Sequence, residues 1–120
     1  IRDSHQLDRW FNKEFLDANA NIAEKITKIL DNNSHEDFLK SYKLFAHLED
    51  NLINFNEIEA ETLVCTANED VGSVPEMSNQ LGAEISNSRV VIFDNGKHMV
   101  GIECAKEVNK IFNNFIEGTK

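Results

Sequence analysis

The spacing of hydrophobic residues changes near the middle of the chain. In the first 50 residues, apolar side chains recur every three or four positions, which is the spacing of an amphipathic helix. This part is predicted to hold three helices, over roughly Leu7–Phe15, over roughly Asn21–Leu30, and from Ser34 onward. The segment Asp31-Asn32-Asn33 is expected to end the second helix. Ser34 and Asp37 form a pair that resembles a capping box at the start of the third.

Two short apolar runs in the second half are typical of strands. One begins with Thr62-Leu63-Val64 and the other covers Val90–Phe93, and neither alternates polar with apolar residues. Such runs are buried on both faces of a parallel sheet. The segment from Pro75 to Ile85 can form the crossover helix that parallel strands need. The second half is therefore predicted to be strand, helix, strand, helix, with an amphipathic last helix over Val108–Ile116.

An acidic residue follows the first predicted strand, and a histidine follows the second. Asp70 and His98 would meet at one edge of a parallel sheet, where α/β proteins place their functional sites. A carboxylate that holds an imidazole is two-thirds of a hydrolase triad. Taken separately, an aspartate after a strand is commonly a turn residue, and a loop histidine is commonly a surface residue. The matched positions of the two residues favour the catalytic interpretation.

These motifs resemble the C-terminal part of an α/β-hydrolase. In that family the triad acid follows a strand of the type Thr62-Leu63-Val64, and a loop with a proline, here Ser73-Val74-Pro75, leads into a helix. The histidine lies in a Gly-x-His loop, here Gly96-Lys97-His98, and an acidic residue, here Glu103, follows it. The resemblance implies an α/β fold: a helical lid segment, then strand-helix-strand-helix with parallel strands.

The resemblance also implies roles for individual residues. Asp70 would be the triad acid and His98 the triad base, in the family's order nucleophile, acid, histidine. The family usually has a glycine where this chain has Ala67, which leaves Glu69 as an alternative acid. The nucleophile motif Gly-x-Ser-x-Gly does not occur in the 120 residues. The chain also begins with Ile1, so we expect a longer parent protein with the nucleophile and oxyanion hole upstream. No cofactor would be needed.

The helical half resembles the lid of the same family. Arg9-Trp10-Phe11, Ser41-Tyr42 and Leu48-Glu49-Asp50 are similar to the lid motifs of 3-oxoadipate enol-lactonases and their relatives. The resemblance implies that residues 1–50 form a helical lid (cap) segment and that residues 51–120 form the C-terminal part of the hydrolase core.

The implied substrate is a small carboxylic ester or lactone, of which 3-oxoadipate enol-lactone is one candidate. Lids of this family lie over the active site, so Trp10 could line a substrate pocket. An aromatic residue on an amphipathic helix is more often simply part of the core. Both interpretations of Trp10 stay open at this point.

Two other functions are also open. One is a non-catalytic, helix-rich interaction domain in which Asp70 and His98 are ordinary loop residues. The other keeps the fold but changes the chemistry, since dehalogenases and acyltransferases share this scaffold. The sequence upstream would separate them: Gly-x-Ser-x-Gly supports a hydrolase, an aspartate nucleophile supports a dehalogenase, and no nucleophile supports the interaction domain.

Charge and composition limit which binding partners are expected. The net charge of −9 argues against nucleic acid or an anionic membrane as a binding partner, and no apolar run approaches the length of a membrane span. No His-Glu-x-x-His or Cys-x-x-Cys motif favours a metal site, and His5, His35 and His47 are expected at the surface. Cys65 and Cys104 could pair, but two reduced thiols in a cytoplasmic protein is the interpretation we prefer. Two parallel strands would leave open edges, so the isolated chain is expected to self-associate and to be inactive.

Overall fold

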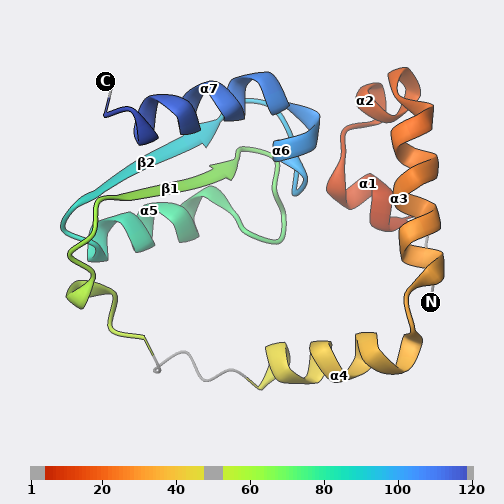
Figure 1. Ribbon diagram of the computed structural model, residues 1–120, viewed down its shortest axis with the longest axis horizontal. Helices are drawn as coiled ribbons and strands as arrows, with labels where there is room; N and C mark the ends of the chain where they lie inside the picture. The colour runs from red at the N-terminus through yellow and green to blue at the C-terminus, as the bar shows by residue number, and fades with distance from the viewer. Residues whose placement is uncertain (1–4, 48–52, 119–120) are drawn as a thin grey trace.

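The computed structural model describes residues 5–47 and 53–118. A helical half is followed by a small parallel sheet between helices (Figure 1). The elements in chain order are α1 (His5–Trp10), α2 (Lys13–Ala18), α3 (Ala20–Asn32), α4 (His35–Ala46), the 3-10 turn η1 (Phe55–Glu57), β1 (Thr62–Ala67), α5 (Pro75–Glu84), β2 (Ser88–Phe93), α6 (Val100–Glu103) and α7 (Ala105–Ile116). The predicted order strand, helix, strand, helix is confirmed, with the short α6 added before the last helix.

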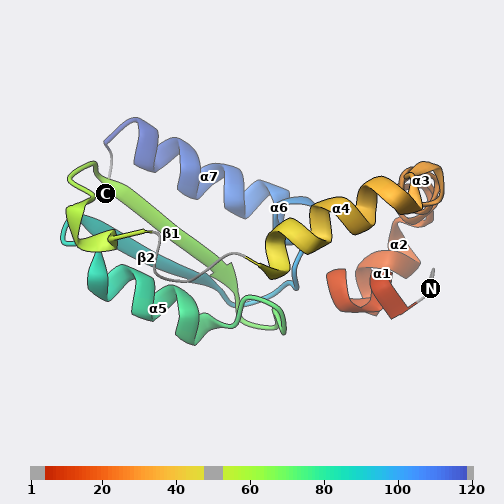
Figure 2. The same cartoon turned by 90° about the horizontal axis from the view of Figure 1, so that it is seen from below.

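The sheet consists of β1 and β2, which pair in parallel from Thr62 opposite Ser88 to Ala67 opposite Phe93. Helix α5 lies on one face of this pair and α7 lies on the other, as Figure 2 shows. Pro75 begins α5, at the first helical position, where the missing N–H costs no helical hydrogen bond. The three layers enclose the core, whose buried apolar residues in this half are Val64, Ala67, Ile85, Phe93 and Val108.

The first predicted helix is wrong in its continuity. The structure has two short helices there, and Asn12 between them is extended, with φ −69° and ψ 146°. The backbone N–H of Asn12 donates to Glu103 Oε1 at 2.7 Å instead of to a helical carbonyl. A partner from the far end of the chain thus satisfies the donor that the break in the helix exposes. Buried Phe11 and half-buried Phe15 still stack, with ring centroids 5.4 Å apart across the break.

The other helices of this half begin and end close to the predicted positions. Helix α3 continues through Asp31 and Asn32, so the predicted break is reduced to Asn33, which is extended. The predicted cap of α4 is confirmed, because Ser34 Oγ accepts a hydrogen bond from the Asp37 N–H at 3.2 Å. One or two residues of difference at a helix end are ordinary, since terminal turns fray.

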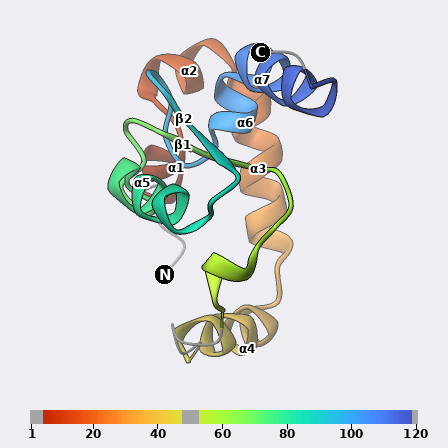
Figure 3. The same cartoon turned by 90° about the vertical axis from the view of Figure 1, so that its left-hand side faces the viewer.

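Helix α4 keeps its apolar side chains exposed. Figures 1 and 3 show this helix apart from the sheet, at the far side of the helical half. Phe45 is 73% exposed, although it belongs to an amphipathic helix. The exposed large apolar residues of α4 are Phe38, Leu39, Tyr42, Leu44 and Phe45. An apolar helix face without a partner in the described residues is a candidate contact surface.

Candidate active site

The first part of the site is the loop that follows β1. The Asn68 N–H donates to the Phe93 carbonyl at 2.8 Å, which continues the parallel pairing one residue past the strand. The Asp70 N–H then donates to the Ala67 carbonyl at 3.2 Å and closes a turn. This turn buries Asp70, whose exposed fraction is 6%. Ala67, at the position where a glycine was the expected residue, is fully buried and accommodated.

Both carboxylate oxygens of Asp70 have partners. Oδ1 accepts the N–H groups of Gly72 at 2.8 Å and Ser73 at 3.0 Å, while Oδ2 lies 3.0 Å from His98 Nδ1. Burial by itself raises the pKa of the Asp70 carboxyl. The hydrogen bonds from Ser73, Gly72 and His98 together outweigh burial and hold this pKa below its ordinary value. The site therefore contains a buried carboxylate that is ionised at neutral pH.

The second part of the site is the loop that carries His98. Gly96 has φ +101°, a conformation that side chains rarely adopt, and an added Cβ would lie 3.0 Å from Val100 Cγ2. The Gly96 carbonyl accepts the Glu69 N–H at 3.3 Å, which joins the histidine loop to the aspartate loop. The Lys97 N–H donates to Glu103 Oε2 at 2.8 Å. The two residues before His98, Gly96 and Lys97, are therefore held by hydrogen bonds to Glu69 and Glu103.

The imidazole of His98 is oriented by its contact with the Asp70 carboxylate. Its side chain is 47% exposed, while the Asp70 side chain against it is nearly buried. An ionised carboxylate can only accept a hydrogen bond, so the proton between the two groups belongs to His98 Nδ1. In the neutral imidazole that tautomer leaves a lone pair on Nε2. The arrangement can therefore act as a general base.

Trp10 comes from the helical half and reaches the same place. Its ring stacks on the His98 ring, with centroids 6.5 Å apart and planes inclined by 29°. Its carbonyl accepts the Met99 N–H at 3.0 Å. Trp10 is only half-buried, whereas its neighbour Phe11 is fully buried. Phe11 is therefore the core aromatic of this segment, and Trp10 lies at the histidine.

The alternative acid, Glu69, points elsewhere. Its side chain is exposed, and Oε1 accepts from Asn12 Nδ2 at 3.4 Å rather than facing His98. The other predicted lid motifs do not join the site: Tyr42 is exposed on α4, and Leu48-Glu49-Asp50 lies outside the described residues. Sequence reasoning did not anticipate the contacts of Asn12 or of Glu103. Their only signal was that an acidic residue follows the Gly-x-His loop.

The remaining titratable residues have structural surroundings. His5, His35 and His47 are exposed, as predicted. Cys65 and Cys104 are free thiols, and burial raises the pKa of both. Within residues 5–47 and 53–118, no cluster of three or more histidine, cysteine or acidic side chains could hold a metal ion. None of the helices described there is both long enough and apolar enough to cross a membrane.

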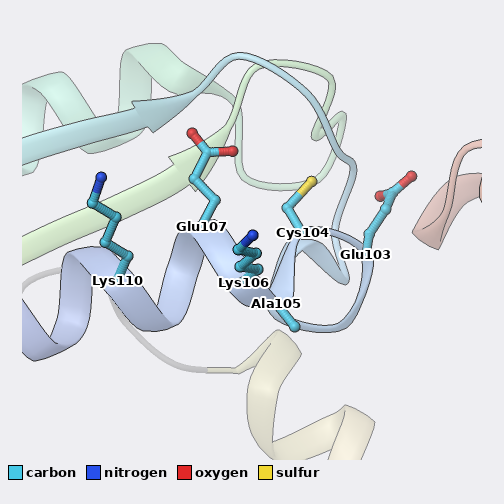
Figure 4. A pocket seen from close by; sticks show the side chains of 6 residues that line it. All are labelled: Glu103, Cys104, Ala105, Lys106, Glu107 and Lys110. Atoms are coloured by element: carbon cyan, nitrogen blue, oxygen red, sulfur yellow. The ribbon is translucent and has the colours of Figure 1, made fainter.

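A surface depression of about 400 Å³ lies at the start of α7 (Figure 4). Its lining residues are Glu103, Cys104, Ala105, Lys106, Glu107 and Lys110. Neither Asp70 nor His98 lines it, and three of its six lining residues, Lys106, Glu107 and Lys110, are exposed. The paired side chains, rather than this depression, therefore identify the candidate active site.

Comparisons with known proteins agree with this architecture. No protein-family model matches the chain. The chain is 26% identical over 116 residues to the (E)-2-((N-methylformamido)methylene)succinate hydrolase of Acinetobacter baylyi. The matched region covers 94% of this chain and 43% of that protein. Its structure matches the enol-lactonase from Burkholderia xenovorans LB400 with a TM-score of 0.86 at 20% identity, again over 94% of this chain and 43% of the other. The chain thus spans less than half the length of either relative. It has the fold of the C-terminal part of an α/β-hydrolase.

Proposed function

We propose that this chain supplies two of the three triad residues of a serine-type α/β-hydrolase, with Asp70 as the acid and His98 as the base. The observation that carries the proposal is the 3.0 Å contact between Asp70 Oδ2 and His98 Nδ1, at the carboxyl ends of adjacent parallel strands. The nucleophile and the oxyanion hole would come from outside the 120 residues, since the chain has no Gly-x-Ser-x-Gly motif.

The mechanism follows from the tautomer of His98. Nε2 would take the proton of the serine hydroxyl as the serine oxygen attacks the substrate carbonyl. The imidazolium that forms would then return the proton to the leaving-group oxygen as its bond to the acyl carbon breaks, which leaves an acyl-enzyme; in a lactone this oxygen stays attached to the acyl group. Water would release the acyl group in a second, equivalent cycle. Asp70 would stabilise the imidazolium, because its carboxylate already lies at Nδ1.

The two halves would divide the work. Residues 1–50 would form a helical lid segment, and residues 51–120 the C-terminal part of the catalytic core. The position of Trp10 supports this division, because a residue of the helical half stacks on His98. A half-buried indole beside the base is well placed to contact an acyl group or a leaving group. We therefore include Trp10 in the substrate site.

The proposed substrate is a small carboxylic ester or lactone. One similar protein is named an enol-lactonase and the other a hydrolase of a substituted methylenesuccinate. Both names favour hydrolysis over the dehalogenase and acyltransferase alternatives. An enol-lactone such as 3-oxoadipate enol-lactone is the specific candidate to test first.

The central test is kinetic, in the full-length protein. His98→Ala removes the base and should lower kcat by several orders of magnitude, while Asp70→Asn should lower it by up to about 10⁴-fold. The double variant should be barely slower than the slower single one, because the residues act as one unit. Exposed His35→Ala is the matched control and should keep full activity. Near-full activity in His98→Ala would reject the triad and favour the interaction domain.

A second test uses the ionised state of Asp70. Its pKa is lowered in the fold, so its charged form stabilises the protein above the ordinary aspartate pKa, and this contribution is lost as pH falls through the lowered value. At pH 7, Asp70→Asn should reduce the free energy of unfolding by about 1.5–3 kcal/mol, the range for hydrogen bonds to charged groups. The difference from wild type should shrink below about pH 4. Urea unfolding at several pH values measures it, with exposed Glu69→Gln as control, and a pH-independent difference would contradict the assignment.

A third test concerns Trp10. If its indole contacts substrate, Trp10→Ala should change KM or substrate preference, and melting should change little. If Trp10 is core instead, the truncation should cost about 3–5 kcal/mol of stability and leave the kinetics per folded molecule unchanged. The buried Phe11→Ala variant supplies the reference for a true core loss. Kinetics and melting measured on one preparation of each variant decide between the two roles.

A fourth test concerns the chain alone. Each strand has an open edge within the described residues, and α4 exposes an apolar face, so we propose that the isolated 120-residue chain binds a second copy of itself. Its sedimentation coefficient should rise with concentration. Phe45→Glu should weaken association, whereas Ser41→Glu, the same added charge at an exposed polar position of α4, should not. A monomer at all concentrations would contradict the proposed self-association. We also propose that the isolated chain is inactive, and aryl-ester turnover that is lost in His98→Ala would contradict that.

A further inference from the structure

One side chain outside the proposed triad joins the two halves of the molecule. Glu103 Oε1 accepts the Asn12 N–H at 2.7 Å, and Glu103 Oε2 accepts the Lys97 N–H at 2.8 Å. Asn12 marks the break between α1 and α2, and Lys97 directly precedes His98. A single carboxylate from α6 therefore holds the helical half and the histidine loop at once.

The local backbone is shaped for this contact. Asn12 stands just before α2, where an N–H has no partner inside the helix and needs one from elsewhere. Gly96, with φ +101°, turns the chain so closely that an added Cβ would lie 3.4 Å from Glu103 Oε2. Hydrogen bonds to an ionised acceptor are about twice as strong as neutral ones. The bridge is therefore among the stronger links between the halves.

Two more hydrogen bonds tie the same segments together. The Met99 N–H donates to the Trp10 carbonyl at 3.0 Å, and Lys97 Nζ donates to the Asp8 carbonyl at 2.7 Å. The end of α1 is thus attached to the residues on both sides of His98. These attachments hold the backbone of Trp10 beside the histidine loop, where its ring stacks on the imidazole.

We infer that Glu103 is a positioning residue: its carboxylate fixes His98 and Trp10 in one arrangement by binding the backbone of the histidine loop and of the helical half together. This inference rests on the proposed function. It adds that the placement of the base depends on the helical half through Glu103. Movement of the α1–α2 break would be passed to His98 through two hydrogen bonds.

Replacing Glu103 by glutamine tests these two hydrogen bonds directly. Glutamate offers two accepting oxygens to the two N–H groups, whereas glutamine of the same shape offers one acceptor and one donor. Glu103→Gln can therefore satisfy Asn12 or Lys97, but not both. Glu103→Ala satisfies neither. A reacting group displaced by about 1 Å can cost about 10²-fold in rate, so we expect Glu103→Gln to lower kcat by about 10- to 100-fold.

The experiment compares these variants in the full-length protein. We would measure kcat, KM and the hydrogen exchange of the Asn12 and Lys97 amides, which does not depend on activity. Glu103→Gln should speed exchange at one of the two amides, and Glu103→Ala at both. Glu107→Gln makes the same chemical change at an exposed position one turn along and should alter neither amide. Asn12→Ala keeps the N–H that Glu103 binds and removes only the weak contact with Glu69, so it should keep protection of Lys97.

The outcomes separate the inference from the proposed function. Wild-type kcat together with unchanged exchange in Glu103→Gln would overturn the inference, even if His98→Ala is inactive. A loss of kcat with unchanged exchange would overturn it too, because the effect would not pass through these two bonds. If His98→Ala stays active, the proposed function fails, and the exchange data still decide whether Glu103 joins the halves. Should Glu103→Ala fail to fold, the isosteric Glu103→Gln carries the test.

Discussion

The parallel register of β1 and β2 is the constraint on which the rest of the site depends. Because Ala67 lies opposite Phe93, the loops that leave the two strands start side by side at one sheet edge. The bond from the Asn68 N–H to the Phe93 carbonyl extends this register into the loops. A slip of one residue would turn every side chain to the other face and separate the loops. The meeting of Asp70 and His98 is therefore a consequence of strand pairing.

Two carboxylates, those of Asp70 and Glu103, hold the histidine loop through different partners. Asp70 is buried and collects donors from its own loop and from His98, so the loss of any one partner leaves a buried charge less satisfied. Glu103 binds backbone N–H groups from two distant segments. His98 is thus held through its ring by Asp70, and the preceding residue, Lys97, is held through its N–H by Glu103. The proposed role of His98 as a base would need this kind of fixed orientation.

The sequence predicted correctly those helices and strands that are determined by residues close to one another in the chain. The apolar runs and Pro75 indicated strand, helix and strand, and Ser34 indicated the start of α4, because each signal acts within a few residues. The break at Asn12 was missed because its N–H is satisfied by Glu103, 91 residues away, and helical periodicity contains no information about that partner. Asp70 and Glu69 are adjacent in the sequence, so only the turn geometry decides which of them faces His98.

The helical half and the sheet half are joined by hydrogen bonds close to the proposed catalytic pair. In the described ranges, the hydrogen bonds between the halves are made by Asp8, Trp10 and Asn12 in the helical half, and by Glu69, Lys97, Met99 and Glu103 in the sheet half. Helix α4, whose large apolar side chains are exposed, lies apart from the sheet (Figure 1). The bonds around Glu103 join the helical half to the loop that carries His98. The contacts that hold His98 in place would therefore depend on how the helical half is seated.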